Sequence, residues 1–175
     1  GELLTRDGRN IASVIRRLQE NNSEVADRIM EYLQAVVPGL RSVEVVDLQH
    51  KQALRFRQAV RGARDPWSFA AVNVSDGTMR ALGVLVAAFQ TQATNKFPVP
   101  LVGIEEPETA IHPGAAVKLM DALLEASRHT QIVITTHSPE LLDHPEIKDN
   151  MLLAVEAEQG QTFIAPVDGT TRRAI

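Results

Sequence analysis

Two adjacent carboxylates follow directly on an apolar segment near the middle of the chain. Residues 101–104 are aliphatic apart from one glycine, and Glu105 and Glu106 come next, before Pro107. A buried strand normally ends at a turn residue, so two acids here place ionised groups at the carboxyl edge of a sheet, where open α/β folds bind ligands. The pattern indicates a catalytic or metal-binding site, and a strand followed by a solvated acidic turn is an equally good explanation of this segment alone.

A second polar cluster, residues 75–78, stands immediately before an apolar helical segment that ends at Phe89. Ser75 can cap that helix. Gly77 would let backbone N–H groups approach an anion closely, and the helix dipole favours a phosphate at this end. An ordinary N-cap is the alternative interpretation.

A second apolar segment, residues 131–136, ends at His137-Ser138-Pro139. The segment between the two predicted strands begins a helix at Pro113 and continues to about Arg128. Strand, helix and strand in series predict a parallel βαβ unit. This topology would bring Glu105, Glu106 and His137 to the same edge of the sheet.

The rest of the chain predicts elements that surround this unit. Asn10 and Ser23 are candidate N-caps of two amphipathic helices, the second of which stops at Pro38-Gly39. Period-two alternation then predicts antiparallel strands within residues 43–60 and from Trp67 to Val74, and a hairpin from residues 151–155 and 162–167 around Gln159-Gly160. We divide the chain into a helical and antiparallel subdomain, 1–73, and an α/β lobe, 74–175.

Composition is that of a globular protein with the length of one domain. The chain has 175 residues, 44% of them hydrophobic, and a formal net charge of -4, which argues against a uniformly basic surface for nucleic acid. It has no cysteine, which excludes disulfides and thiolate metal sites and agrees with a cytoplasmic location. The longest strongly apolar run, 81–89, is shorter than the roughly 17–25 residues of a membrane span, so we predict no membrane partner.

The predicted antiparallel strands form the most basic part of the chain. Such a region can follow a phosphate backbone, which leaves DNA open as a partner. The alternation of the strands explains the same charges as a solvated sheet face, and this interpretation is favoured because few aromatic residues lie between them. The basic residues are Lys51, Arg55, Arg57, Arg61 and Arg64.

Three segments, in this order, resemble motifs of ABC-type ATPases of the SMC/RecF-like group. Residues 74–78 (Val-Ser-Asp-Gly-Thr) resemble the signature, residues 104–108 (Ile-Glu-Glu-Pro-Glu) the Walker B motif, and residues 135–139 (Thr-Thr-His-Ser-Pro) the switch histidine. The resemblance is closest to AAA-type ATPases related to RecF and to the ATPase part of OLD-family nucleases. It implies a P-loop NTPase fold of the ABC-type ATPase head, mainly a parallel sheet flanked by helices, with a helical and antiparallel subdomain and a C-terminal hairpin.

The resemblance also implies a role for each motif residue. Ser75, Asp76, Gly77 and Thr78 would bind the γ-phosphate of an ATP held mainly by another subunit. Glu105 would hold Mg²⁺, Glu106 would orient or deprotonate the attacking water, and His137 would donate a hydrogen bond to the γ-phosphate. The D-loop, which would contact the opposing subunit of an ATP-bound homodimer, is Thr109, Ala110, Ile111 and His112.

This sequence departs from the family pattern in ways that matter for activity. Asp76 stands where the signature usually has glycine, Glu105 stands where the Walker B motif usually has aspartate, and His112 replaces the D-loop acid. No Gly-Lys pair occurs, so the Walker A phosphate loop is missing. Because the chain also begins at Gly1 rather than Met, we expect the C-terminal half of an ATPase head, inactive alone and partnered by an N-terminal half.

The sequence therefore leaves three functions open. The leading one is a dimerising ATPase acting in DNA repair, replication or defence. The second is an ATP-independent scaffold with a degenerate head, which Asp76 and Glu105 would support. The third is a metal-dependent nuclease, in which Glu105, Glu106, Glu108 and His112 would be metal ligands.

Overall fold

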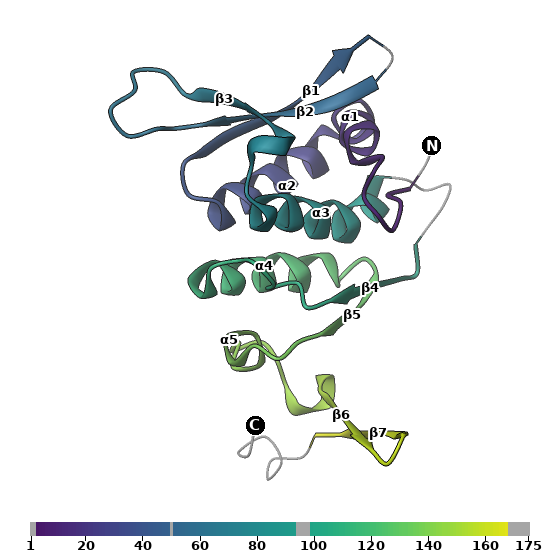
Figure 1. The fold of residues 1–175 in the computed structure, drawn as a ribbon. Coiled ribbons are helices and arrows are strands. Elements are labelled where there is room, and N and C mark those ends of the chain that lie inside the picture. The colour runs from purple at the N-terminus through teal and green to yellow at the C-terminus, as the bar shows by residue number, and fades with distance from the viewer. Residues whose placement is uncertain (1–2, 50, 94–98, 168–175) are drawn as a thin grey trace. The chain divides into compact units, whose positions relative to one another are not determined.

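The computed structural model describes residues 3–49, 51–93 and 99–167. Its internal contacts divide the chain into two compact units, residues 1–136 and 137–175. The first unit contains four long helices, a three-stranded antiparallel sheet and a parallel pair of strands, and the second contains a hairpin. Figure 1 labels the helices and strands of both units.

Two amphipathic helices begin the first unit, as the 3.6-residue spacing of their apolar residues predicts. They are α1 (Ile11–Asn21) and α2 (Ser23–Val36), and they pack against each other. Each buries one apolar stripe, and Leu18 and Leu33 are fully inaccessible to solvent. The side chains on the two buried stripes are Ala12, Val14, Ile15 and Leu18 of α1 and Val25, Ile29, Leu33 and Val36 of α2.

The capping of these helices differs from the prediction. Asn10 precedes α1, but its side chain makes no cap hydrogen bond: Oδ1 accepts from the Thr5 amide at 2.9 Å and Nδ2 donates to the Leu3 carbonyl at 2.8 Å. The cap of α2 is Asn22, whose Oδ1 accepts from the Val25 amide at 3.3 Å, and not Ser23. Asn22 is the single residue between the end of α1 at Asn21 and the start of α2 at Ser23. Helix α2 therefore begins one residue earlier than the pattern indicated.

The antiparallel sheet follows with strand order β1-β2-β3. Val43, Phe56 and Phe69 lie opposite one another across the three strands, and Val43 and Phe56 are buried on the face that packs against α1 and α2 (Figure 1). The strands are β1 (Leu40–Leu48), β2 (Lys51–Gln58) and β3 (Trp67–Ala70).

The third strand is shorter than predicted. Residues 71–73 form a 3₁₀ turn, η1 (Ala71–Asn73), instead of continuing β3 to Val74. This turn redirects the chain into the next helix, α3 (Asp76–Phe89), and leaves Val72 89% exposed. The apolar alternation in the sequence therefore extends beyond Ala70, the last residue of β3.

Both signs of charge occur on the solvent face of this sheet. Arg55 and Arg57 are exposed on β2, as the alternation predicted. Glu44 lies opposite Arg55, and its carboxylate is 3.7 Å from the Arg57 guanidinium. A pair as exposed as this one contributes little to stability.

Helix α3 is the most buried element of the first unit. It packs against α2, α1 and α4 (Pro113–Ala126), and this packing joins the elements on both sides of residue 73 into one unit. The contacts thus place the division at residue 136, whereas the sequence-based division lies at residue 73. Although α3 is strongly apolar, no helix in the described part of the chain has the length and hydropathy needed to cross a bilayer.

A parallel pair of strands completes the first unit, which confirms the predicted βαβ unit. The strands are β4 (Leu101–Glu105) and β5 (Gln131–Thr135), connected through α4. Val102 pairs with Ile132, and Glu105 pairs with Thr135 at the carboxyl end. As predicted, Pro113 occupies the first turn of α4, but the helix ends at Ala126 and not at Arg128.

An ionic cluster joins α2 to α4. Arg28 donates to Glu125 from both Nε, at 2.8 Å, and Nη2, and its guanidinium lies over the Tyr32 ring at 4.6 Å from the centroid. The hydroxyl of Tyr32 also donates to Glu125, at 2.8 Å. The hydrogen bonds from Arg28 lower the pKa of Glu125 to about 2, while burial together with the Glu125 bond raises the pKa of Tyr32 to about 12.

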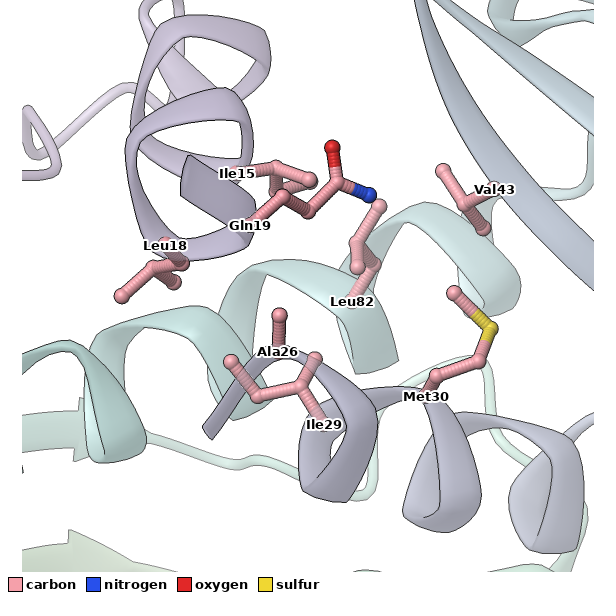
Figure 2. Close-up of a pocket in the computed structure, with 8 residues that line it drawn as sticks. All are labelled: Ile15, Leu18, Gln19, Ala26, Ile29, Met30, Val43 and Leu82. Atoms are coloured by element: carbon pink, nitrogen blue, oxygen red, sulfur yellow. The ribbon is translucent and has the colours of Figure 1, made fainter. Parts of the chain in front are cut away.

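A small cavity of about 20 Å³ lies between α1, α2, β1 and α3 (Figure 2). Seven of the eight side chains that line it are apolar, and Gln19 is the exception. A space of this size holds about one water molecule, so it is a packing gap in the core and not a ligand site.

The second unit is built around a β-hairpin, as the sequence predicts. Gln159 and Gly160 both have positive φ, 49° and 79°, which is the geometry of a two-residue hairpin turn. Leu153, Val155 and Ile164 are 62–65% exposed. The elements of this unit are α5 (Pro139–Leu142), η3 (Asp149–Met151), β6 (Leu153–Glu158) and β7 (Gln161–Pro166).

Candidate functional site

The two predicted catalytic acids lie where β4 ends. Glu105 is its last residue and Glu106 follows it, and both are exposed. The Glu106 amide donates to the Thr135 carbonyl at 2.8 Å and so extends the ladder between β4 and β5 by one bond. Glu106 has φ 41°, in the left-handed region that disfavours side chains with a Cβ. The chain therefore turns sharply at the residue predicted to activate water.

A tight loop begins at Glu106. The Glu106 carbonyl accepts a hydrogen bond from the Thr109 amide at 3.0 Å, and the Glu106 carboxylate Oε2 accepts one from the Thr109 hydroxyl at 3.1 Å. Ala110 has φ 62°, and the Ile111 amide donates to the Glu108 carbonyl at 2.9 Å. The predicted D-loop is thus a hydrogen-bonded loop whose first turn orients the Glu106 carboxylate.

The N-terminus of α3 has the capping geometry that the sequence predicts. Ser75 Oγ accepts from the Thr78 amide at 3.2 Å and lies 2.9 Å from the Thr78 hydroxyl. Thr78 is only 6% exposed, while Ser75 and Asp76 are exposed. The carboxylate of Asp76 reduces the positive potential at this helix end, which would make the site weaker for a phosphate.

Gly77 brings this helix end into contact with the predicted D-loop at Ala110. A Cβ at Gly77 would overlap the carbonyl oxygen of Ala110 and lie 3.0 Å from its carbonyl carbon. Only glycine permits this approach of the two backbones. The structure thus places the N-terminus of α3 beside the loop that follows β4, and it gives Gly77 a packing role that spacing in the sequence did not reveal.

Arg80 makes a second connection between the same elements. Its guanidinium donates to the carbonyl oxygens of Glu105 and Glu106, with Nη2 2.9 Å and Nε 3.3 Å from the Glu106 oxygen. Sequence reasoning missed this residue, because an arginine in the first turns of a helix has no distinctive spacing from the strand it contacts.

The proposed nuclease ligands do not gather. Glu108 accepts a hydrogen bond from the Thr136 hydroxyl, and His112 caps α4, its Nδ1 accepting from the Gly114 amide at 3.2 Å. The described residues contain no group of three or more His, Asp or Glu side chains that could hold a metal ion. Three of the four candidate ligands, Glu106, Glu108 and His112, thus have hydrogen-bond partners within the chain, and the metal-dependent nuclease stays a prediction.

His137, the predicted switch residue, is the first residue of the second unit. It directly follows Thr136 and precedes α5, whose N-cap is Ser138. Ser138 Oγ donates to Glu140 at 2.7 Å, and this bond lowers the pKa of the Glu140 carboxyl. That His137 meets Glu105 and Glu106 at one edge stays a prediction.

A protein-family comparison matches residues 2–143, which contain both strand ends and the N-terminus of α3. The family is described as "AAA domain, putative AbiEii toxin, Type IV TA system". The chain belongs to this family. Its AAA domain thus spans nearly all of the first unit and the start of the second. A search of curated proteins found no match.

Solved structures of SMC ATPase heads have the same fold as this AAA domain. A structure described as "Structural biochemistry of ATP-driven dimerization and DNA stimulated activation of SMC ATPases" is 12% identical, with a TM-score of 0.62 over 91% of this chain and 93% of that chain. The Smc head with coiled coil and joint from Pyrococcus yayanosii is 12% identical, with a TM-score of 0.66 over 87% and 28%. The SMC head from Thermotoga maritima is 18% identical, with a TM-score of 0.53 over 90% and 52%.

These matches confirm the predicted α/β fold of an SMC/RecF-like ATPase head. The chain spans about half the length of the Thermotoga head and 28% of the Pyrococcus chain. It therefore corresponds to part of those larger proteins.

Proposed function

We propose that this chain supplies the signature helix, the Walker B acids and the D-loop of an ATPase that hydrolyses ATP with Mg²⁺. The observation that carries the proposal is the contact of Gly77 with Ala110. It sets the N-terminus of α3, an anion-favouring helix end, beside the loop that follows two exposed carboxylates. Phosphoryl transfer needs this combination of phosphate binding, metal binding and water activation.

The carboxylates suit a magnesium ion that is shared with a nucleotide. Mg²⁺ is usually held by one or two carboxylates together with substrate phosphates and water, so a cage of protein ligands is not required. Glu105, exposed at the end of β4, would hold it. The bound ion would neutralise charge on the phosphates. Glu106 would accept a proton from the attacking water, and the Thr109 hydroxyl would orient its carboxylate.

The phosphate loop must come from another polypeptide segment, because the sequence contains no Gly-Lys pair. The parallel pair of strands offers a surface for it. Leu101 and Val133 lie on one face of this pair and are 51% and 50% exposed. Parallel sheets are normally covered on both faces, so this face fits the N-terminal half of an ATPase head. Closure of the site would then use a second copy, in a homodimer formed through ATP.

The decisive experiment is ATP turnover by the chain assembled with a segment that carries the phosphate loop. Glu106→Gln should lower kcat about 100-fold or more while ATP binding is kept, since a general base typically contributes that much. Glu20→Gln, on the exposed C-terminal end of α1, is the matched control. Equal turnover by Glu106→Gln and by the control would refute the assignment.

A second candidate is an ATP-independent scaffold, which the exposed carboxylate of Asp76 at the N-terminus of α3 favours. Calorimetry of the assembled protein with ATP and Mg²⁺ separates the ATPase from the scaffold, because a scaffold should release no heat of binding.

For the active ATPase we infer a role in defence ahead of DNA repair, since the family description names a toxin–antitoxin system. DNA remains a candidate partner through the basic residues of β2.

A further inference from the structure

We propose that Arg80 is a positioning residue that holds the backbone of Glu106 in its left-handed conformation. The inference rests on the proposed function, in which the Glu106 carboxylate receives the proton of water. Arg80 would not touch the nucleotide. It would act through the two carbonyl groups at the end of β4.

The contacts of Arg80 are those that its side chain makes best. The side chain is half-buried, and its guanidinium reaches two consecutive carbonyl oxygens, those of Glu105 and Glu106. Nη2 and Nε both donate to the second oxygen, at 2.9 Å and 3.3 Å. A planar guanidinium with several donors can bind two neighbouring oxygens at once, whereas a lysine ammonium is a single point. The arrangement therefore requires arginine.

Glu106 needs such a restraint. A residue other than glycine at φ 41° is held against the local preference of its backbone, and such conformations persist only where the surrounding structure fixes them. The Glu106 carbonyl accepts bonds from both Arg80 and the Thr109 amide. Bonds from a charged donor are stronger than those between neutral groups. Loss of Arg80 would leave the carbonyl groups of Glu105 and Glu106 less restrained, and a change in the φ of Glu106 would then redirect its carboxylate.

The neighbouring contact of Gly77 supports this assignment. Gly77 and Arg80 are three residues apart and so lie on the same side of α3. One contacts the end of the loop at Ala110, and the other contacts its beginning at Glu106. A single turn of α3 thus fixes both ends of the loop that carries the catalytic acid.

Amide hydrogen exchange in the 175-residue chain tests the positioning directly. The Thr109 amide donates to the carbonyl that Arg80 holds. Arg80→Ala should speed its exchange about 10-fold or more, relative to amides in the middle of α4, because local opening is then easier. Arg80→Lys should give an intermediate rate. Arg55→Ala, on the exposed face of β2, is the control and should leave the rate unchanged. An unchanged Thr109 rate in Arg80→Ala overturns the proposal.

Turnover by the assembled ATPase separates positioning from nucleotide binding. Arg80→Ala should lower kcat about 10-fold or more with KM within about twofold, as expected when an interaction acts only on the chemical step. A rise in KM with kcat unchanged would make Arg80 a nucleotide ligand and overturn the proposal. If the unsubstituted assembly hydrolyses no ATP, the proposed function fails, and the exchange experiment still decides whether Arg80 holds the loop.

Discussion

Two glycines of α3 should respond in opposite ways to the same substitution. Gly77 meets the Ala110 carbonyl, whereas a Cβ at Gly83 meets no atom within 4 Å. Both lie in one helix, and neither has positive φ. Alanine is therefore conformationally allowed at both positions, and the difference between the variants isolates the contact with the loop at Ala110.

The magnitudes follow from the geometry. Forcing an extra carbon into a packed contact costs about 1–3 kcal/mol, and the upper part of that range applies at Gly77 because the obstacle is backbone and cannot rotate away. Alanine in place of glycine returns up to about 1 kcal/mol of helix propensity. We expect Gly77→Ala to destabilise the first unit by about 1–2 kcal/mol, and Gly83→Ala to stabilise it by up to about 1 kcal/mol.

Urea unfolding measures this difference. Trp67 is the only tryptophan and lies in the first unit, so its fluorescence reports on the part of the chain that contains both glycines. With a slope of about 2 kcal/mol per molar urea, the two midpoints should differ by about 1 M, without a change in slope. Equal midpoints would show that α3 does not approach the loop at Ala110, and the contact on which the proposed function rests would be refuted.

Two further predictions concern the ionic cluster and the strained acid. Glu125 has a folded-state pKa of about 2 against an ordinary 4.5, so its contribution is fully present above about pH 4.5 and is lost as the pH falls through 2. Glu125→Gln should therefore cost about 1 kcal/mol at pH 7 and much less at pH 2, as unfolding at the two pH values would measure, and an equal loss at both would contradict the pairing. Glu106→Gly should abolish turnover yet leave the free energy of unfolding unchanged or raised by up to about 1 kcal/mol, since glycine tolerates positive φ. A decrease in the free energy of unfolding above about 1 kcal/mol would argue against backbone strain at this residue.

The sequence was sufficient wherever a pattern is local. Period 3.6 located α1, α2 and α4, period two located the strands of the sheet, and the Gln159-Gly160 turn located the hairpin. Ser75 and Pro113 act at the helix starts as their residue types predict. Each of these features depends on residues within a few positions of one another.

What the sequence could not predict depends on distant partners. Arg80 and Glu106 are 26 residues apart, and Arg28 and Glu125 are 97 apart. No spacing rule connects such pairs before the topology is known. Asn10 illustrates the same limit at short range, because its side chain bonds the preceding segment in place of the helix it was expected to cap.

The parallel pair of strands has a practical consequence. Among the described residues, β4 and β5 pair with no other strand, so each has an outer edge without a neighbouring strand. Unprotected edges beside an apolar face promote aggregation. The chain should therefore be recovered in better yield when it is co-expressed with the proposed N-terminal half of the ATPase head than when it is produced alone. Light scattering during refolding would then provide a simple assay for that complementary segment.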